Sequence, residues 1–119
     1  MTGLPVPVIY KICTTSEWAE AERAGVYRGS AVDRRDGFIH FSTAEQLAET
    51  AAKHFAGLPD LVLVSVDTNA LGDPLKWEPS RGGALFPHLY GDLPLEAVLR
   101  AVPLPLDASG SHVFPRALR

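Results

Sequence analysis

The most informative stretch of the chain is residues 37–43, which read Gly-Phe-Ile-His-Phe-Ser-Thr. Side chains alternate between the two faces of a β-strand, so Phe38, His40 and Ser42 are predicted to share one face. The apolar residues between them form the back of the strand. An imidazole in an apolar run must find a partner or stay neutral, and neutral imidazole suits binding and acid–base chemistry. The stretch therefore predicts a strand whose front forms part of a site.

A second stretch, residues 86–91 with the sequence Phe-Pro-His-Leu-Tyr-Gly, repeats this arrangement. Alternation places Phe86, His88 and Tyr90 on one face, opposite a purely apolar back. Two strands that mix aromatic with hydrogen-bonding groups on their fronts are typical of the walls of a small-ligand cleft.

Further strands are predicted from short apolar runs. They cover residues 8–13, 26–27, 61–66, 75–78 and 98–104, beside the histidine strands at 36–41 and 84–90. The continuous run at 61–66 indicates a central strand, whereas Pro103 places the last strand at an edge. The rest of residues 26–35 is predicted to be a polar connection.

Two helices are predicted from capping boxes, in which a hydroxyl residue is followed three positions later by Glu or Gln. The first box, at 14–17, starts a helix that Gly25 ends. Two overlapping boxes, at 42–45 and 43–46, start a second helix that runs as an apolar stripe at helical spacing to Gly57.

Strands with two helices inserted early predict a single α+β domain with a mainly antiparallel sheet. We assign residues 1–119 to one domain because 119 residues are too few for two of ordinary size. The segment 105–119 is predicted to be a tail of small and polar residues that is either disordered or packed across the surface.

Composition bounds the function. The chain is 46% hydrophobic and 21% charged, with a net charge of −3 and no basic run, so a footprint on duplex nucleic acid is not expected. No signal peptide and no apolar run of about 20 residues is present, so we expect a cytoplasmic protein without a membrane partner. The sole cysteine, Cys13, excludes an intramolecular disulfide and is expected to be an inert buried thiol.

The front of the first histidine strand allows several chemistries. His40 is a candidate general base, a ligand for a substrate hydroxyl or a metal ligand, or else a buried histidine bonded to backbone. Ser42 is a candidate ligand contact, a nucleophile with His40 as its base, or a helix cap whose hydroxyl is already occupied.

Glu78 and the aromatic residues add further candidates. Glu78 follows Trp77 at a strand end, where it is either a catalytic acid or base with a raised pKa or a solvated hairpin residue. Tyr10 and Tyr90 could stack on a flat ligand ring, although such residues are more often core. His54 is expected on a solvated helix face.

A metal site would need at least three ligands. His40, His88 and Glu78 could form a two-histidine, one-carboxylate site, but no His-x-x-x-His or His-x-His spacing supports it. No metal is therefore expected.

Several motifs occur together in a distinctive order. They are Ile9-Tyr10-Lys11-Ile12, Trp18, Gly25-Val26-Tyr27, residues 37–43, Leu61-Val62-Leu63-Val64, Lys76-Trp77-Glu78 and residues 86–94. This order resembles domain-of-unknown-function family 952, a family of small bacterial proteins, over roughly residues 8 to 104.

The resemblance implies an ADP-ribosyltransferase-like fold, because the family has been grouped with that fold on remote similarity. In that superfamily a split β-sheet holds NAD⁺ in a cleft. The resemblance then implies that Tyr10 and Lys11 take the first-strand position and that residues 38–43, including Ser42 and Thr43, lie at the cleft. Glu78, or His88 with Tyr90, would approach the position of the catalytic glutamate.

Lys11 departs from the family pattern, in which relatives commonly have Ile-Tyr-His-Ile. Lysine is a flexible point charge without acceptor capacity, whereas imidazole is a rigid ring. If that histidine contacts NAD⁺, this protein would bind the nucleotide weakly or differently. Alternation also sets Lys11 opposite Tyr10, so we expect one of the two to face the cleft.

Three functions follow as hypotheses. The leading one is an ADP-ribosyltransferase-like protein in which Glu78 stabilises a ribosyl cation or acts as base, His40 orients the ribose and His88 contributes to catalysis. The second is a non-catalytic module that binds a small metabolite or a peptide. The third is a metal-assisted hydrolase that uses His40 and His88. All three use a cleft lined by aromatic, histidine and hydroxyl side chains: Tyr10, His40, Ser42, Glu78, His88 and Tyr90. The sequence carries no signal for the oligomeric state.

Overall fold

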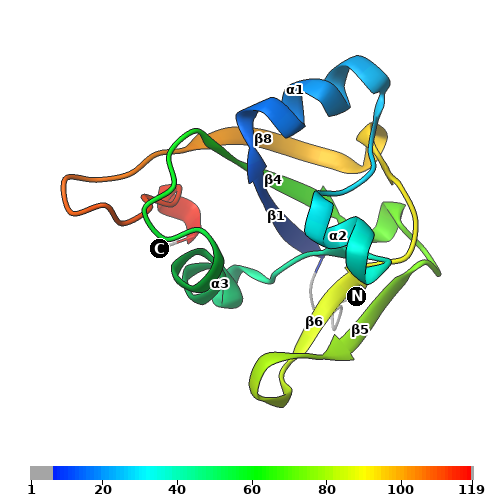
Figure 1. The fold of residues 1–119 in the computed structure, drawn as a ribbon. Helices are drawn as coiled ribbons and strands as arrows, with labels where there is room; N and C mark the ends of the chain where they lie inside the picture. Colours follow the sequence, from blue (N-terminus) through cyan, green and yellow to red (C-terminus); the bar gives the residue numbers. More distant parts are fainter. Residues whose placement is uncertain (1–6, 119) are drawn as a thin grey trace.

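The computed structural model describes residues 7–118. Its elements, with η for a 3-10 helix, run in the order β1 (Val8–Thr14), α1 (Thr15–Ala24), β2 (Val26–Tyr27), α2 (Ala31–Asp36), β3 (Ile39–His40), η1 (Ala44–Gln46), α3 (Leu47–His54), β4 (Leu61–Asp67), η2 (Thr68–Ala70), β5 (Leu75–Pro79), η3 (Arg81–Gly83), β6 (Leu85–Leu89), β7 (Leu93–Pro94), η4 (Leu95–Ala97), β8 (Val98–Leu104) and η5 (Arg116–Leu118). This is a small α+β domain, as predicted (Figure 1).

The strands form separate antiparallel groups. The main sheet has the order β1-β4-β8, a second has the order β3-β6-β5, and β2 pairs with β7. The central place of β4 and the edge place of β8 are confirmed. A bridge between Tyr10 on β1 and Ser42 just after β3 joins the two larger sheets, with backbone N···O distances of 2.8 and 2.9 Å. The two three-stranded sheets therefore meet along one side of β1.

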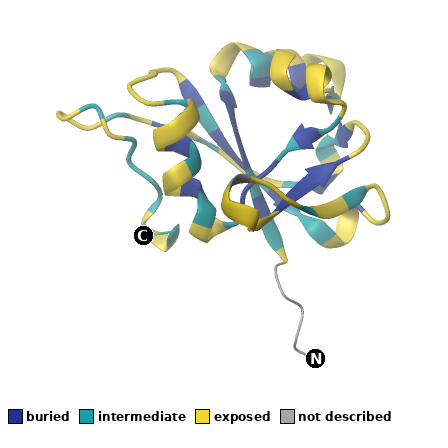
Figure 2. Cartoon of the chain, turned by 60° about the horizontal axis from the view of Figure 1, so that its bottom comes forward, coloured by how far each residue is buried: buried dark blue, intermediate teal, exposed yellow. Residues whose placement is uncertain are grey.

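The apolar core lies in two clusters on opposite faces of the main sheet. One contains Ile9, Cys13 and Val64 and extends to α1, β2 and β3. The other contains Ile12 and Leu63 and extends to α3 and the last residues of the chain. Figure 2 shows the buried strands enclosed by helices whose outer faces are exposed. The alternation that the sequence predicts for β1 thus determines which residue enters which core.

Both predicted helices form, with a correction at the second. Thr14 and Glu17 make a complete capping box at α1, and Gly25 ends it with φ +79°. At the second helix the cap is Thr43, paired with Gln46, and it begins a 3-10 turn that leads into α3. Ser42 is not the cap, because it is still paired with β1 through its backbone. The interpretation of Ser42 as a helix cap is therefore wrong.

A short helix, α2, was missing from the prediction, which treated residues 26–35 as a strand followed by a polar connection. Ser30 caps α2, and Asp33 closes the box by accepting a hydrogen bond from the Ser30 backbone N–H. Gly37 ends the helix with φ +90°. The expectation of two helices was thus incomplete, and the additional helix carries two carboxylates to the first histidine strand.

The C-terminal segment packs across the surface rather than extending away from it. Leu106 and His112 form an isolated bridge, and Phe114 and Leu118 pack against the second core cluster. His112 Nε2 lies 2.9 Å from the carbonyl oxygen of Leu58. Of the two outcomes left open for this tail, the structure shows the packed one for the residues it describes.

Among the described residues no helix is long and apolar enough to cross a membrane.

Candidate functional site

The register between β3 and β6 brings the two histidines together. His40 lies directly opposite His88 in this antiparallel pair, and directly opposite residues share a face with Cβ atoms about 5 Å apart. The ring centroids are 5.6 Å apart and the rings meet edge to face at 69°. The two histidine segments therefore form one structure, although the histidines are 48 positions apart in sequence.

Phe38 fills the space in front of both histidines. Its ring stacks on His88 with centroids 4.1 Å apart and lies 4.6 Å from the ring of His40. Tyr90 completes the group, with its ring centroid 5.2 Å from that of Phe38. The predicted shared face of Phe38 and His40 is confirmed, and the packed rings leave the imidazoles little freedom to reorient.

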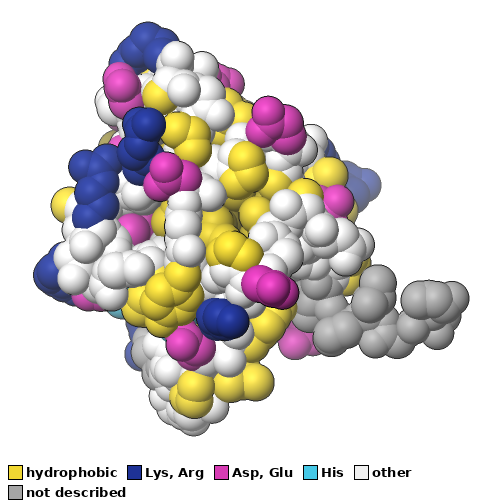
Figure 3. Space-filling model, turned by 90° about the vertical axis from the view of Figure 1, so that its right-hand side faces the viewer, with side chains coloured by type: hydrophobic (Ala, Val, Ile, Leu, Met, Phe, Trp, Pro, Cys, Tyr) yellow, Lys and Arg dark blue, Asp and Glu magenta, His cyan; other side chains and the backbone are white. Residues whose placement is uncertain are grey.

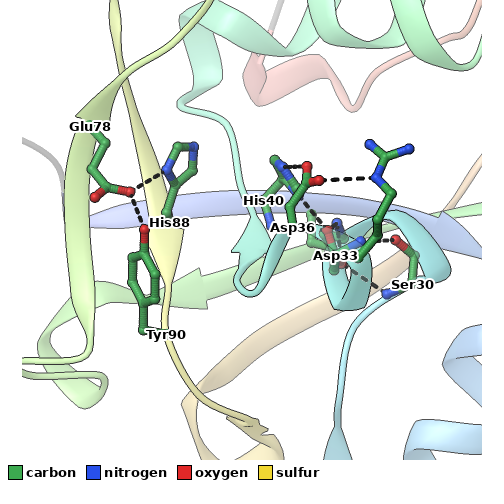
Figure 4. A network of polar contacts seen from close by, with 9 residues as sticks. Ser30, Asp33, Asp36, His40, Glu78, His88 and Tyr90 are labelled. Carbon is green, nitrogen blue, oxygen red and sulfur yellow. Dashed lines mark hydrogen bonds and ion pairs between the residues drawn. The ribbon is translucent and has the colours of Figure 1, made fainter.

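Glu78 holds His88 from the neighbouring strand. Lys76 is the residue directly opposite His88, so Glu78 lies diagonally across from it. Glu78 Oε1 is 2.7 Å from His88 Nδ1 and accepts a second hydrogen bond from the Tyr90 hydroxyl at 2.8 Å (Figure 4). The hydrogen bond with His88, followed by that from Tyr90, lowers the pKa of Glu78, and the contact with Glu78 raises the pKa of Tyr90.

An ionised Glu78 can only accept, so His88 Nδ1 carries the proton, and in the neutral ring Nε2 is then the acceptor nitrogen. Within residues 7–118 we find no hydrogen-bond partner for this nitrogen. The pair has the arrangement of a carboxylate-oriented general base, in which the acid fixes the ring and its tautomer.

His40 is held differently, by carboxylates on both sides of its ring. Nδ1 lies 2.6 Å from Asp33 Oδ1, and Nε2 lies 3.0 Å from Asp36 Oδ2 (Figure 4). His40 therefore has a carboxylate at each of its ring nitrogens.

Asp33 is the centre of this cluster and is 2% exposed. Its carboxylate also accepts from the backbone N–H groups of Ser30 and His40, and its Oδ2 lies 2.8 Å from the buried Lys11 ammonium. Burial opposes ionisation of Asp33, but the hydrogen bond with His40 and the charge of Lys11 outweigh it and hold its pKa well below the ordinary value. Asp36, which is more exposed, has a lowered pKa chiefly because it bonds Arg35.

Gly29 allows Asp33 to occupy this place. Its φ is +100°, and a Cβ at this position would lie 2.8 Å from the Cβ of Asp33. Any other residue would be strained in its backbone and would collide with the helix that carries the buried carboxylate.

A cavity of about 460 Å³ opens beside the two histidines. Its volume lies within the range of about 300–1,000 Å³ that is typical of ligand sites. The wall combines aromatic and aliphatic side chains with a small polar group. The polar members include Lys11, Asp33, His40, Ser42, Thr50 and His88, and the apolar members include Tyr10, Ile12, Phe41, Phe55 and Phe86.

Most of the predicted cleft residues lie on this wall. Tyr10, His40, Ser42 and His88 line it as predicted. Lys11 lines it as well, so the expectation that one of Tyr10 and Lys11 would face the cleft is wrong.

The other predicted residues lie outside the lining. Glu78 bonds both His88, which lines the cavity, and Tyr90, but neither Glu78 nor Tyr90 lines the cavity itself. Thr43 caps the turn that leads into α3. Ser42 Oγ bonds Thr50 Oγ1 at 2.9 Å. His54 is exposed, as expected, but it also contributes to the cavity wall.

Sequence reasoning missed the two aspartates of α2. The signal that could have found them is the spacing of Ser30 and Asp33, which matches the cap at Thr14 and Glu17. Asp33 is unusual because the same carboxylate closes the capping box and binds Lys11 and His40.

The described residues contain no group of three or more His, Cys, Asp or Glu side chains arranged to hold a metal ion. His40, one of the two histidines of the hydrolase hypothesis, already meets carboxylates with both ring nitrogens. Cys13 is buried, and burial raises the pKa of its thiol to about 12, so this sulfur is a poor nucleophile.

Solved structures similar to this protein match nearly the whole chain. The fold is similar to the crystal structure of protein CC0527 from Caulobacter crescentus, with 51% sequence identity and a TM-score of 0.89 over 93% of this chain and 97% of that one. A crystal structure of a double mutant of CC0527 gives 50% identity and a TM-score of 0.88, with the same coverage of each chain. Its solution NMR structure gives 54% identity and a TM-score of 0.79, over 87% of this chain and 90% of that one.

No curated protein matches the chain. A family model described as "protein of unknown function (DUF952)" matches residues 12–101, within the range over which the sequence motifs resemble this family. The chain belongs to the DUF952 family.

Proposed function

We propose that the cavity binds the nicotinamide–ribose part of NAD⁺ and that the protein transfers the ribosyl group to a hydroxyl acceptor or to water. The observation that carries this proposal is His88, whose Nδ1 is fixed by Glu78 and whose unpartnered Nε2 belongs to a residue of the cavity wall. A base that is held by a carboxylate beside a mainly apolar cavity is suited to removing a proton from a bound acceptor.

The location of the cavity supports the proposal. The resemblance to the ADP-ribosyltransferase-like fold implies a ligand between the halves of a split sheet. The cavity lies where β1 of one sheet meets the end of β3 of the other, and residues of both sheets line it. Its apolar wall would exclude water from a reactive ribosyl cation.

The reaction balances without a further reagent. The bond between ribose C1′ and the nicotinamide nitrogen breaks, and its electron pair leaves with nicotinamide. The acceptor oxygen bonds to C1′, and its proton passes to Nε2 of His88. Glu78 then stabilises the resulting imidazolium through Nδ1. In this reaction Glu78 positions His88 and does not touch the ligand.

His40 has a different part in the proposal. Its Nδ1 is bound by the buried Asp33, whereas Asp36, which faces Nε2, retains 32% of its side-chain exposure. A ribose hydroxyl can replace the Asp36 oxygen as the acceptor at Nε2. His40 would then orient the sugar while its buried contact remains in place.

The experiment is calorimetric titration of NAD⁺ into metal-stripped protein, followed by a nicotinamide-release assay. The informative variant is His88→Gln, because His40→Ala would leave Asp33 and Asp36 without their shared partner. His112→Gln is the matched control, since this histidine bonds Leu58 in the C-terminal segment and is not part of the cavity wall.

We expect NAD⁺ to bind the unchanged protein and the control, and nicotinamide release to be lost in His88→Gln. Catalytic loss of about 10²–10⁴-fold is typical when a general base is removed. Absence of binding by the unchanged protein, or equal release by His88→Gln and the control, would refute the proposal. Thermal unfolding of each variant separates loss of function from loss of fold.

A further inference from the structure

A second hollow adjoins the cavity. Its volume is about 420 Å³, and it lies between α1 and the start of α2. It shares three lining residues with the first cavity, Glu17, Ser30 and Ala31. The two hollows are therefore neighbours at the start of α2.

The charged side chains of the hollow are unequally paired. Glu17 is occupied by the backbone N–H of Thr14 at 2.9 Å, and Glu20 binds Arg23 of its own helix. Arg28 and Arg34 also line the hollow.

Neither arginine has a close partner. Arg28 lies 3.7 Å from Asp92, and both side chains are more than half exposed, so this pair is weak. Between residues 7 and 118 no ion pair or side-chain hydrogen bond involves the Arg34 guanidinium. The two glutamates of this hollow thus have close hydrogen-bond or ion-pair partners, whereas the guanidinium groups of Arg28 and Arg34 are available to bind an anion.

Basic side chains also gather on one flank of the face that Figure 3 presents, next to an apolar centre. Guanidinium groups bind phosphate through two parallel hydrogen bonds, and such charge-assisted contacts are roughly twice as strong as neutral ones. A mainly apolar cavity next to a hollow with two available arginines fits a ligand with a flat ring system at one end and phosphates at the other.

We infer that the second hollow is a diphosphate subsite, in which Arg28 and Arg34 bind the phosphates of a nucleoside diphosphate group. This inference builds on the proposed function, because it would assign the nicotinamide–ribose part of the dinucleotide to the cavity and the diphosphate to the hollow. It also explains how a site without a phosphate-binding glycine loop would hold a dinucleotide.

The test titrates each half of the ligand separately. ADP probes the hollow and nicotinamide riboside, which carries no phosphate, probes the cavity. The variants are Arg34→Gln and the double variant Arg28→Gln/Arg34→Gln. Arg100→Gln is the control, because it removes the same charge from β8, outside both hollows.

We expect ADP to bind the unchanged protein and Arg100→Gln, with affinity at least about tenfold lower in Arg34→Gln and lower again in the double variant. The affinity for ADP should fall as salt is raised. The arginine variants should leave the affinity for nicotinamide riboside unchanged.

The outcomes separate the two proposals. Binding of nicotinamide riboside without binding of ADP would overturn the diphosphate subsite and leave the proposed function standing. Equal affinity for ADP in the double variant and in Arg100→Gln would also overturn it. Arginine-dependent binding of ADP without any binding of nicotinamide riboside would support the subsite and refute the proposed function.

Discussion

The two histidine–carboxylate clusters differ in what is left for a ligand. His40 meets Asp33 at Nδ1 and Asp36 at Nε2, so both ring nitrogens are engaged. His88 meets Glu78 at Nδ1 alone. Two imidazoles opposite each other in one sheet therefore differ in their surroundings, because carboxylates face both ring nitrogens of the first and only Nδ1 of the second.

Burial of the carboxylates makes the same distinction. Asp33 is 2% exposed and is bound to Lys11, which is also buried, whereas the side chain of Glu78 is 37% exposed. A buried charge that loses its partner is costly, but a half-exposed one can be solvated. The His40 cluster should therefore be a determinant of stability and the His88 cluster a determinant of activity.

The largest effect is expected from Asp33→Ala. The change leaves the buried Lys11 without its partner and removes the acceptor of His40, so the free energy of unfolding should fall by about 3–5 kcal/mol. Urea denaturation measures this loss. In Lys11→Met/Asp33→Ala the loss should be smaller than the sum of the two single losses, and strict additivity would show that the pair is not coupled.

Gly29→Ala should damage the same cluster without touching its charges. The new Cβ would lie 2.8 Å from the Cβ of Asp33 at a backbone φ of +100°. We expect a loss of about 1–3 kcal/mol in the free energy of unfolding. Gly57→Ala is the matched control, because it has a similar positive φ but no atom within 4 Å of the new Cβ. Equal losses in both variants would mean that backbone strain, and not the Asp33 contact, is responsible.

The fall in the free energy of unfolding at acid pH should show the contribution of the His40 cluster through Asp33. The folded pKa of Asp33 lies below its unfolded value of about 3.9, so the unfolded state binds the extra proton between those two values. Its stabilising contribution is present above about pH 4 and is lost as the pH falls below that value. Unfolding measured between pH 5 and pH 2 should therefore be less pH-dependent in Asp33→Asn, and an unchanged slope would contradict this account.

The smallest effect on stability is expected from Glu78→Gln. The carboxylate is partly exposed, so the free energy of unfolding should change little. Nicotinamide release should nevertheless fall, because an amide can present either donor or acceptor to Nδ1 and no longer fixes the tautomer of His88. A large loss of stability would place this cluster in the same structural class as that of His40.

The pH dependence of release adds a second readout for Glu78. If Glu78 positions the base, Glu78→Gln should change the profile of nicotinamide release with pH. A variant that lowers release equally at all pH values would indicate a purely structural role.

Much of the fold could be predicted from local sequence patterns. Apolar runs gave the strands β4, β5 and β8, and Thr14, Gly25 and Thr43 gave the helix boundaries, because strand alternation and capping act over a few residues. The family also follows from sequence motifs, and the match to residues 12–101 agrees with it.

The packing of distant elements sets the surroundings of the candidate site residues. The sequence predicts two histidine faces, but only the β3–β6 register sets His40 opposite His88, and only the fold of α2 brings Asp33 and Asp36 to one of them. Charge pairing depends on contacts across 22 positions between Lys11 and Asp33, which no local pattern encodes. The sequence by itself thus determined which residues could do chemistry, and the packing of distant elements determined which nitrogen remained available, because hydrogen bonding is settled by three-dimensional neighbours.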